Sequence, residues 1–439
     1  MVHESAGYSG SAALSVDQAP PILVPFRFFL TAPLFGTFAA LLLLFLGPAA
    51  WASRWSAGIL AATHLMALGF LTMVMMGALL QMLPVVAGAP VARAHQVSAL
   101  VHPMLVMGTL ALAWDFLSGG TRVMAAALAL LGSAFIVFIA AITASLLRAR
   151  AAAATVRGMR LSVAALPLTV VLGMSLAVIR TWHVALPFAT LVTLHLAWGL
   201  GGWVGLLVIG VGIQVVPMFQ TTPPYPRIVA ENLTPMIFSA LLGWSLLRVL
   251  AGHAAPDSAG AFIFLAALGY ALYAVITLAL QRRKRRRIPD ITVRFWRTGM
   301  VSLLACALCG LSVLWPGGRS PMPIQLTWGI LAIVGFGVSV VSGMLYKIVP
   351  FLVWLHLSAR PDGRGRLSNM KQIISVRHAN IQFWLHLASI LLLCGAALAP
   401  GWLARPAAAV FACSNLLLGL NLAGAWRLYR GLVSGSARS

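Results

Sequence analysis

Long apolar runs recur along the whole chain, with short polar segments between them. Twelve can be delimited, at residues 28–46, 58–86, 97–117, 123–147, 161–179, 184–219, 233–250, 261–280, 299–314, 324–355, 379–398 and 406–426. Their lengths suit an α-helix, which needs about 20 residues to cross the hydrocarbon core of a bilayer. They lack the alternation that is typical of barrel strands. The pattern predicts an all-α integral membrane protein with about twelve transmembrane helices.

Composition and charge support this interpretation. Hydrophobic residues make up 61% of the 439 residues, charged residues 8%, and the mean hydropathy is +0.96. Such a chain needs lipid as its solvent. The net charge of +23 does not indicate nucleic acid, because the basic residues lie in short connections between apolar runs. One transmembrane domain is predicted at 28–428, with tails at 1–27 and 429–439.

The distribution of Lys and Arg predicts the orientation. If the amino terminus is inside, each outer connection carries one arginine, leaving 24 of the 30 basic residues inside. An excess of this kind marks the cytoplasmic side, so both termini are expected there. The six outer arginines would be Arg54, Arg122, Arg180, Arg248, Arg319 and Arg405.

An internal repeat relates three of the predicted helices. Pro84, Pro217 and Pro350 are each 133 residues apart. Four preceding positions match at the same spacing in each helix: Gly69, Phe70, Gly77 and Gln81; Gly202, Trp203, Gly210 and Gln214; Gly335, Phe336, Gly343 and Lys347. Three parallel units of four helices, at about 28–155, 156–290 and 291–428, therefore predict a pseudo-threefold ring. Parallel repeats count against inverted-repeat transporters.

Ionisable residues within the predicted helices are the first candidates for function. Carboxylates are nearly absent, which disfavours proton pumping, whereas histidines occur near both membrane surfaces. His64 and His195 lie 20 and 22 residues before their repeat prolines, so they share a depth. The two-residue offset turns one side chain by about 200° relative to the other. In a ring of repeats, opposite faces of neighbouring helices border one pore, so both could be axial ligands of a haem.

Other residues could contribute to the same site or to a second one. His183 is a further outer candidate, and Arg54 and Arg180 could pair with haem propionates. The pairs Gly69 with Gly77 and Gly202 with Gly210 could admit a flat macrocycle, although close helix packing explains them equally well. Two inner histidines, His102 and His386, could take part in a copper site. For each histidine alone, a polar contact between helices is the alternative.

The second predicted helix resembles that of NnrS-type membrane proteins. The matching residues are His64 to Phe70, Gly77, Pro84 and Gly88, and Gly88-Ala89-Pro90 is also similar to the end of the second helix in subunit I of haem-copper oxidases and nitric oxide reductases. The resemblance implies twelve helices in three arcs, a haem, expected to be b-type, with copper as a second metal, and the bacterial inner membrane. The tenth helix, however, has no histidine in 324–350, and the seventh lacks paired histidines.

These observations favour a haem-binding membrane protein that acts in electron transfer or in handling nitric oxide. An oxidoreductase activity, if there is one, would lack a complete haem-copper oxygen site. Its partners would be the lipid bilayer, a redox partner or quinol, and nitric oxide as a ligand, with no nucleic acid. Two alternatives stay open: a permease or a metal or haem carrier with the same bundle, and an accessory protein without a cofactor.

Overall fold

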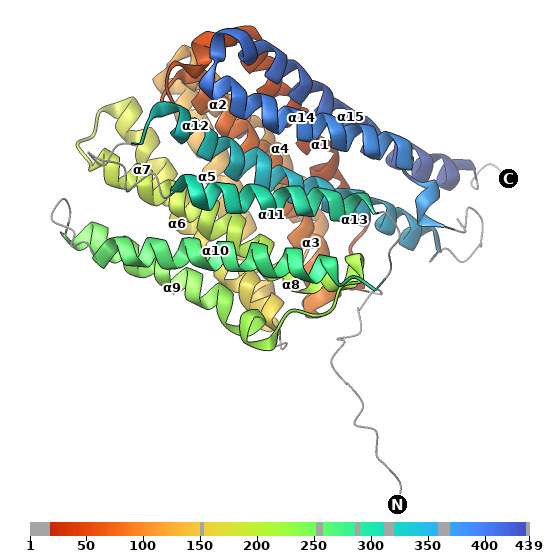
Figure 1. The fold of residues 1–439 in the computed structure, drawn as a ribbon. Helices are drawn as coiled ribbons and strands as arrows, with labels where there is room; N and C mark the ends of the chain where they lie inside the picture. The colour runs from red at the N-terminus through yellow and green to blue at the C-terminus, as the bar shows by residue number, and fades with distance from the viewer. Residues whose placement is uncertain are drawn as a thin grey trace, which may run out of the picture.

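The computed structural model describes residues 18–149, 153–251, 258–285, 290–310, 320–358 and 369–435. Arg319, one of the six arginines predicted to lie in outer connections, is outside these residues. The regular elements of the described ranges are all helical (Figure 1). In chain order they are α1 (Leu23–Leu46), η2 (Gly47–Ala52), α2 (Ala57–His64), η3 (Leu65–Thr72), α3 (Met73–Ala87), α4 (Ala94–Ser118), α5 (Thr121–Arg148), α6 (Ala154–Trp182), α7 (Phe188–Leu196), η4 (Ala197–Gly205), α8 (Leu206–Gln220), α9 (Arg227–Ala251), α10 (Ser258–Arg282), α11 (Ile291–Gly310), α12 (Met322–Ile330), η7 (Leu331–Val338), α13 (Ser339–Ser358), η8 (Met370–Gln372), α14 (Val376–Leu398) and α15 (Pro400–Gly435).

Twelve continuous helical segments of the described residues are long and apolar enough to cross a membrane, which confirms the predicted fold class. The ninth begins at Ile291, eight residues before the predicted apolar run. Arg294 and Arg297 interrupt the hydrophobic pattern of this first part of the helix, although its residues Phe295 and Trp296 are buried in the bundle. The ends also differ from prediction: α1 begins at Leu23 within the predicted tail, and α15 continues to Gly435.

Three helices form the centre of the bundle, one from each predicted repeat. They are the continuous segments α2–η3–α3, α7–η4–α8 and α12–η7–α13. Their most apolar windows are 83%, 67% and 83% buried, whereas the windows of the other nine spans are 28–50% buried. The outer helices close a ring around them, since α5 packs on α6, α10 on α11, and the last helix α15 on α1. This is the arrangement that the repeat predicts.

Each inner helix contains a π-helical stretch at the corresponding place. The stretches η3, η4 and η7 begin at Leu65, Ala197 and Leu331, and each contains the glycine–aromatic pair of the repeat. Each inner helix also carries its repeat proline further along, inside α3, α8 or α13. A π-helical turn inserts an extra residue into an α-helix and is frequent at functional sites. The stretches therefore mark one level of the bundle in all three repeats.

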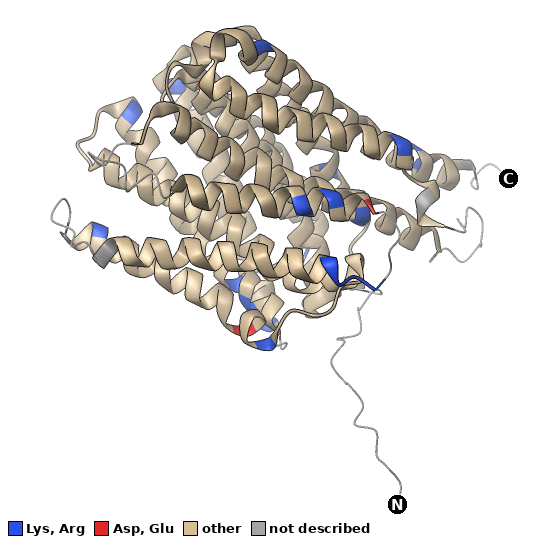
Figure 2. Ribbon diagram, in the orientation of Figure 1, with Lys and Arg blue, Asp and Glu red and all other residues tan. Residues whose placement is uncertain are grey.

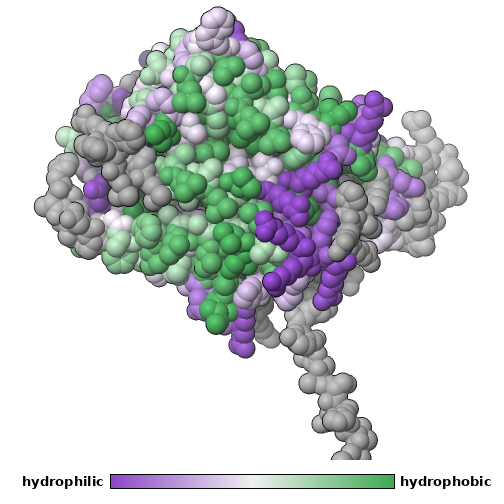
Figure 3. Space-filling model, in the orientation of Figure 1, coloured by the Kyte–Doolittle hydropathy of each residue, from purple (hydrophilic) through white to green (hydrophobic). Residues whose placement is uncertain are grey.

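The surface agrees with a membrane location. Apolar side chains cover the middle of the face seen in Figure 3, and a polar band crosses it toward the end where the described chain begins and finishes. Lys and Arg gather at this same end, which includes the ends of α10, α11 and α15 (Figure 2). Few basic residues lie at the opposite end, among them Arg54, Arg122 and Arg180.

Candidate functional site

The two histidines predicted to share a pore do lie together. His64 ends α2 and His195 is the penultimate residue of α7, so both stand just before the π-helical stretch of their helix. Their ring centroids are 6.4 Å apart and the ring planes differ by 15°. The rings are thus nearly parallel, and their centroids are farther apart than in direct stacking.

Backbone hydrogen bonds fix the tautomer of both rings. Nδ1 of His64 lies 2.8 Å from the Leu60 carbonyl oxygen, and Nδ1 of His195 lies 3.0 Å from the Thr169 carbonyl oxygen. A carbonyl can only accept, so each Nδ1 carries the proton and donates it. Each Nε2 then keeps its lone pair, and neither has a hydrogen-bond partner among the described residues. This is the state of an imidazole that binds a metal through Nε2.

Close neighbours hold the two rings in place. The ring of Phe116 on α4 packs against His64 with centroids 5.0 Å apart. Gly173 on α6 makes room for His195, because a Cβ there would lie 2.8 Å from Cε1 of that ring. Neither contact was predicted, because both come from helices outside the repeat pattern.

A cavity of about 780 Å³ contains both histidines. This volume lies within the range of small-molecule and cofactor sites, about 300–1,000 Å³. Most lining side chains are apolar, and all three inner helices contribute to the wall. Deep in the cavity, Trp203 donates from Nε1 to Oγ1 of Thr72 at 3.1 Å, which ties the first two inner helices together. Trp203 is the aromatic residue of the second repeat motif, so the pattern could have drawn attention to it.

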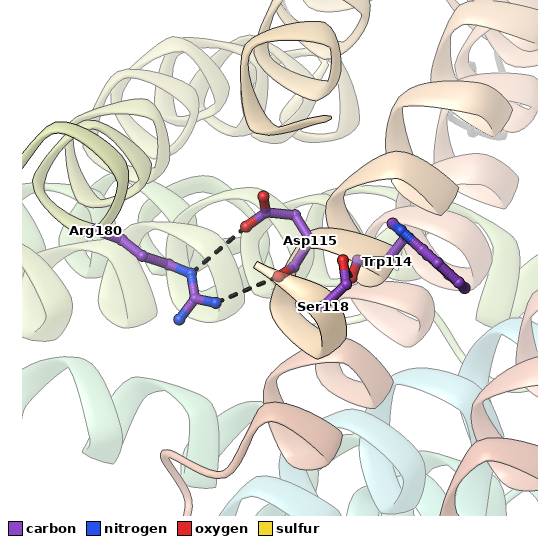
Figure 4. Close-up of polar contacts among 4 residues, drawn as sticks. All are labelled: Trp114, Asp115, Ser118 and Arg180. Carbon is purple, nitrogen blue, oxygen red and sulfur yellow. Dashed lines mark hydrogen bonds and ion pairs between the residues drawn. The ribbon is translucent and has the colours of Figure 1, made fainter. Parts of the chain in front are cut away.

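Two arginines line the same cavity at the end of the bundle with few basic residues. Nε of Arg54 is buried and finds no hydrogen-bond partner among the described residues, and burial lowers the pKa of Arg54 below its usual value. Nε of Arg180 lies 3.5 Å from the carboxylate Oδ2 of Asp115, and Nη2 of Arg180 donates to the backbone carbonyl oxygen of Asp115 at 3.3 Å (Figure 4). Its guanidinium also lies 5.3 Å from the centroid of the Phe116 ring, which packs on His64. The mouth at this end therefore carries the positive charge of Arg54 beside the Arg180–Asp115 ion pair.

The repeat glycines lie elsewhere than the macrocycle interpretation required. A Cβ at Gly69 or Gly77 would meet Phe35 or Phe28 of α1, and a Cβ at Gly202 would meet Ala165 of α6. Gly210 packs directly on the backbone of Gly158 in α6. None of these four glycines of the first two repeats lines the cavity. The glycines that line it are Gly132, Gly173, Gly199 and Gly329. The packing alternative is thus the correct one, because these glycines let helices approach closely.

The remaining predicted histidines lie apart from the pair. His183 directly follows α6 in a left-handed conformation, is exposed, and does not line the cavity. Nε2 of His102 forms a hydrogen bond with the Thr31 hydroxyl at 2.9 Å, and Nε2 of His386 forms one with the Ser339 hydroxyl at 2.8 Å. Among the described residues, no group of three or more His, Cys, Asp or Glu side chains could hold a metal ion. The predicted copper site therefore has no assembled ligand set in this part of the chain.

Comparison with known protein families and with curated proteins finds no match to this chain. The site must accordingly be interpreted from its own geometry.

Proposed function

We propose that this protein binds one haem between His64 and His195 and acts as an electron-transfer protein of the membrane. The observation that carries the proposal is the pair of nearly parallel imidazoles, 6.4 Å apart, each held with Nε2 unprotonated. Two iron–nitrogen bonds of about 2 Å, with about 1 Å from each nitrogen to its ring centre, require a separation of about 6 Å. The 6.4 Å between the two ring centroids agrees with this separation.

The surroundings fit the same cofactor. The cavity is largely apolar, as the faces of a porphyrin require, and Arg54 and Arg180 at its mouth could pair with two propionates. Nε of Arg54 is a buried donor that has no partner within the described residues, which an anionic group would supply. The four cysteines do not line the cavity, so the haem would be held without covalent attachment, as in b-type proteins.

A bound haem supplies a one-electron Fe(III)/Fe(II) couple. The chain's own residues would fix its orientation and exclude water. Because His64 and His195 would both hold the iron, electron transfer is favoured over the handling of nitric oxide, which needs an open position. We further propose, from the excess of Lys and Arg at one end of the bundle, that the cavity mouth faces the outer side of a bacterial inner membrane and that both termini are cytoplasmic.

An optical spectrum of the detergent-purified protein tests the proposal. We expect a low-spin haem spectrum whose reduced form does not bind carbon monoxide readily. His64→Ala and His195→Ala should each lower the haem-to-protein ratio about tenfold or more. Removing a residue that only hydrogen-bonds to a metal ligand already lowers metal affinity by about tenfold or more, and these variants remove a ligand itself. His183→Ala is the matched control and should keep the wild-type spectrum. A colourless protein after reconstitution with haem, or a spectrum indifferent to both substitutions, would refute the assignment.

Electron paramagnetic resonance gives a second readout on the same sample. Nearly parallel axial imidazoles produce a rhombic low-spin ferric signal, whereas perpendicular planes produce a single feature at large g. The 15° angle between the His64 and His195 planes predicts the rhombic signal.

Gly173→Ala should disturb the site without removing a ligand. The new Cβ would lie 2.8 Å from Cε1 and 3.3 Å from Nδ1 of His195, so the ring must move off the Thr169 carbonyl. We expect about tenfold weaker haem retention, the usual cost of losing a partner behind a metal ligand. Gly132→Ala, also in the cavity wall, is the control, because its Cβ meets only the flexible end of Met174. Equal haem retention by the two variants would contradict the argument.

A further inference from the structure

The cavity continues around α2 to the face opposite His64. Ala62 lies two residues before His64, about 200° around the helix, yet both residues line the cavity. Beyond Ala62 the wall passes to α12, α14, α15 and the connection after α1. We call this part the second chamber and define it by Trp51, Ala62, Gln325, Gly329, Leu393 and Phe411, all of which line the cavity. It lies between the first and third repeats.

The second chamber is the repeat-related counterpart of the histidine site. His195 corresponds to Ala62, one repeat spacing of 133 residues earlier, and His64 corresponds to Ile330, two spacings or 266 residues later. Both counterparts line the cavity. The two parts of the cavity thus correspond under the repeat, and apolar side chains stand in the second chamber where the histidine site has two imidazoles. The second chamber cannot hold a haem in the same way, and its occupant must differ.

Polar groups in the second chamber indicate what that occupant is. Trp51 is 4% exposed, lines the cavity, and its Nε1 has no hydrogen-bond partner in the described parts of the chain. A buried indole N–H is a donor only, so it calls for an acceptor. Gln325 donates from Nε2 to the Ser320 carbonyl oxygen at 2.6 Å, which leaves its Oε1 as an acceptor. The chamber thus offers one donor and one acceptor in apolar walls.

We propose that the second chamber binds a lipophilic quinone and its quinol, as the redox partner of the haem site. A quinone is a flat ring whose carbonyl oxygen accepts a hydrogen bond, here from Trp51, and a quinol hydroxyl can donate to Gln325. The aromatic ring of Phe411 and the aliphatic side chain of Leu393 give the head group an apolar wall. The isoprenoid tail belongs in the surrounding bilayer. The assignment of a redox partner rests on the proposed function, whereas the binding itself does not.

The electron count is balanced if the quinol is the donor. Oxidation of one quinol breaks two O–H bonds, yields the quinone and releases two protons. A haem held by His64 and His195 would accept the quinol's two electrons one at a time, and a one-electron metalloprotein at the membrane surface would take up the first before the second is transferred. His64 and Ala62 lie on one helix, so donor and acceptor sites would be separated only by α2.

Binding can be measured on the full chain in lipid nanodiscs with decylubiquinone as the probe. Gly329→Phe should abolish retention of the probe, because this glycine lines the chamber and a Cβ there meets nothing within 4 Å, so a ring can extend into the space. Gly329→Ala adds only a methyl group to that space and should bind as the wild type does. Trp51→Phe keeps an aromatic ring but loses the N–H donor. It should raise the dissociation constant about three- to tenfold, the net value of one hydrogen bond.

Two further measurements separate the outcomes. A His64→Ala/His195→Ala double variant should still bind decylubiquinone, so the chamber can be confirmed even if the protein binds no haem. A decyl-chain analogue with neither carbonyl nor hydroxyl groups should bind at least about tenfold more weakly than the quinone, as expected from the loss of the hydrogen bonds. Equal binding of that analogue, or binding that is indifferent to Gly329→Phe and Trp51→Phe, would overturn the proposal.

Discussion

Replacing Gly210 by leucine should prevent the bundle from assembling. A Cβ at this position would lie 2.8 Å from Cα and 3.0 Å from the carbonyl carbon of Gly158, which are backbone atoms of α6. No rotamer change relieves such a contact, so α6 and α8 must separate along their length. Overpacking of a well-packed core costs about 1–3 kcal/mol and occasionally more, and here we expect at least the upper value. Folded, monodisperse protein should be scarce.

Gly424→Leu is the matched control for this prediction. Gly424 lies in α15, and a Cβ there meets nothing within 4 Å, so the same side chain should be tolerated. Size-exclusion chromatography gives the folded fraction. Thermal unfolding can be followed through the reactivity of the Cys306 thiol, which is buried in the folded protein. A Gly210→Leu protein as stable as Gly424→Leu would show that the two helices can part without loss.

Arg180→Leu should destabilise the protein by leaving Asp115 unpaired. The Asp115 side chain is 2% exposed, its Oδ1 already lacks a hydrogen-bond partner among the described residues, and Arg180 is the cation paired with it (Figure 4). Breaking a buried ion pair from one side costs about 3–5 kcal/mol. Because the Arg180 side chain is 40% exposed, solvent weakens the pair, and we expect about 2–3 kcal/mol.

A double variant isolates the pair interaction. Arg180→Leu/Asp115→Leu removes both charges, so most of the lost stability should return, because replacing both partners by apolar groups is often nearly neutral. Arg122→Leu, at the exposed start of α5, removes a positive charge from the same end and should have little effect. If the double variant is no more stable than Arg180→Leu, then Arg180 stabilises the fold through packing and not through charge.

The features that the sequence predicted well are those with a long period or a fixed spacing. Twelve spans follow from hydropathy, because each helix must be apolar over its whole length. The repeat prolines and glycines indicated the three inner helices. The offset of two residues between His64 and His195, measured from their prolines, predicted opposite faces of two helices around one pore. All of these are properties of single helices or of their periodic relation.

Contacts between helices of unrelated sequence could not be predicted in this way. Gly173 accommodates the His195 ring from α6, and Asp115 meets Arg180 across α4 and α6, without any motif that links them. The repeat glycines were open to two interpretations because a glycine permits close approach by a neighbouring helix or a ligand alike. Only the position of α1 against Gly69 and of α6 against Gly210 decides between them.

The docking of α15 on α1 has a consequence for biosynthesis. Phe411 of the last helix and Leu43 of the first both form part of the cavity wall. A nascent chain that has inserted eleven spans therefore still has an open side. Anything too large for the finished mouth must enter before the carboxyl-terminal helix leaves the ribosome and closes the ring.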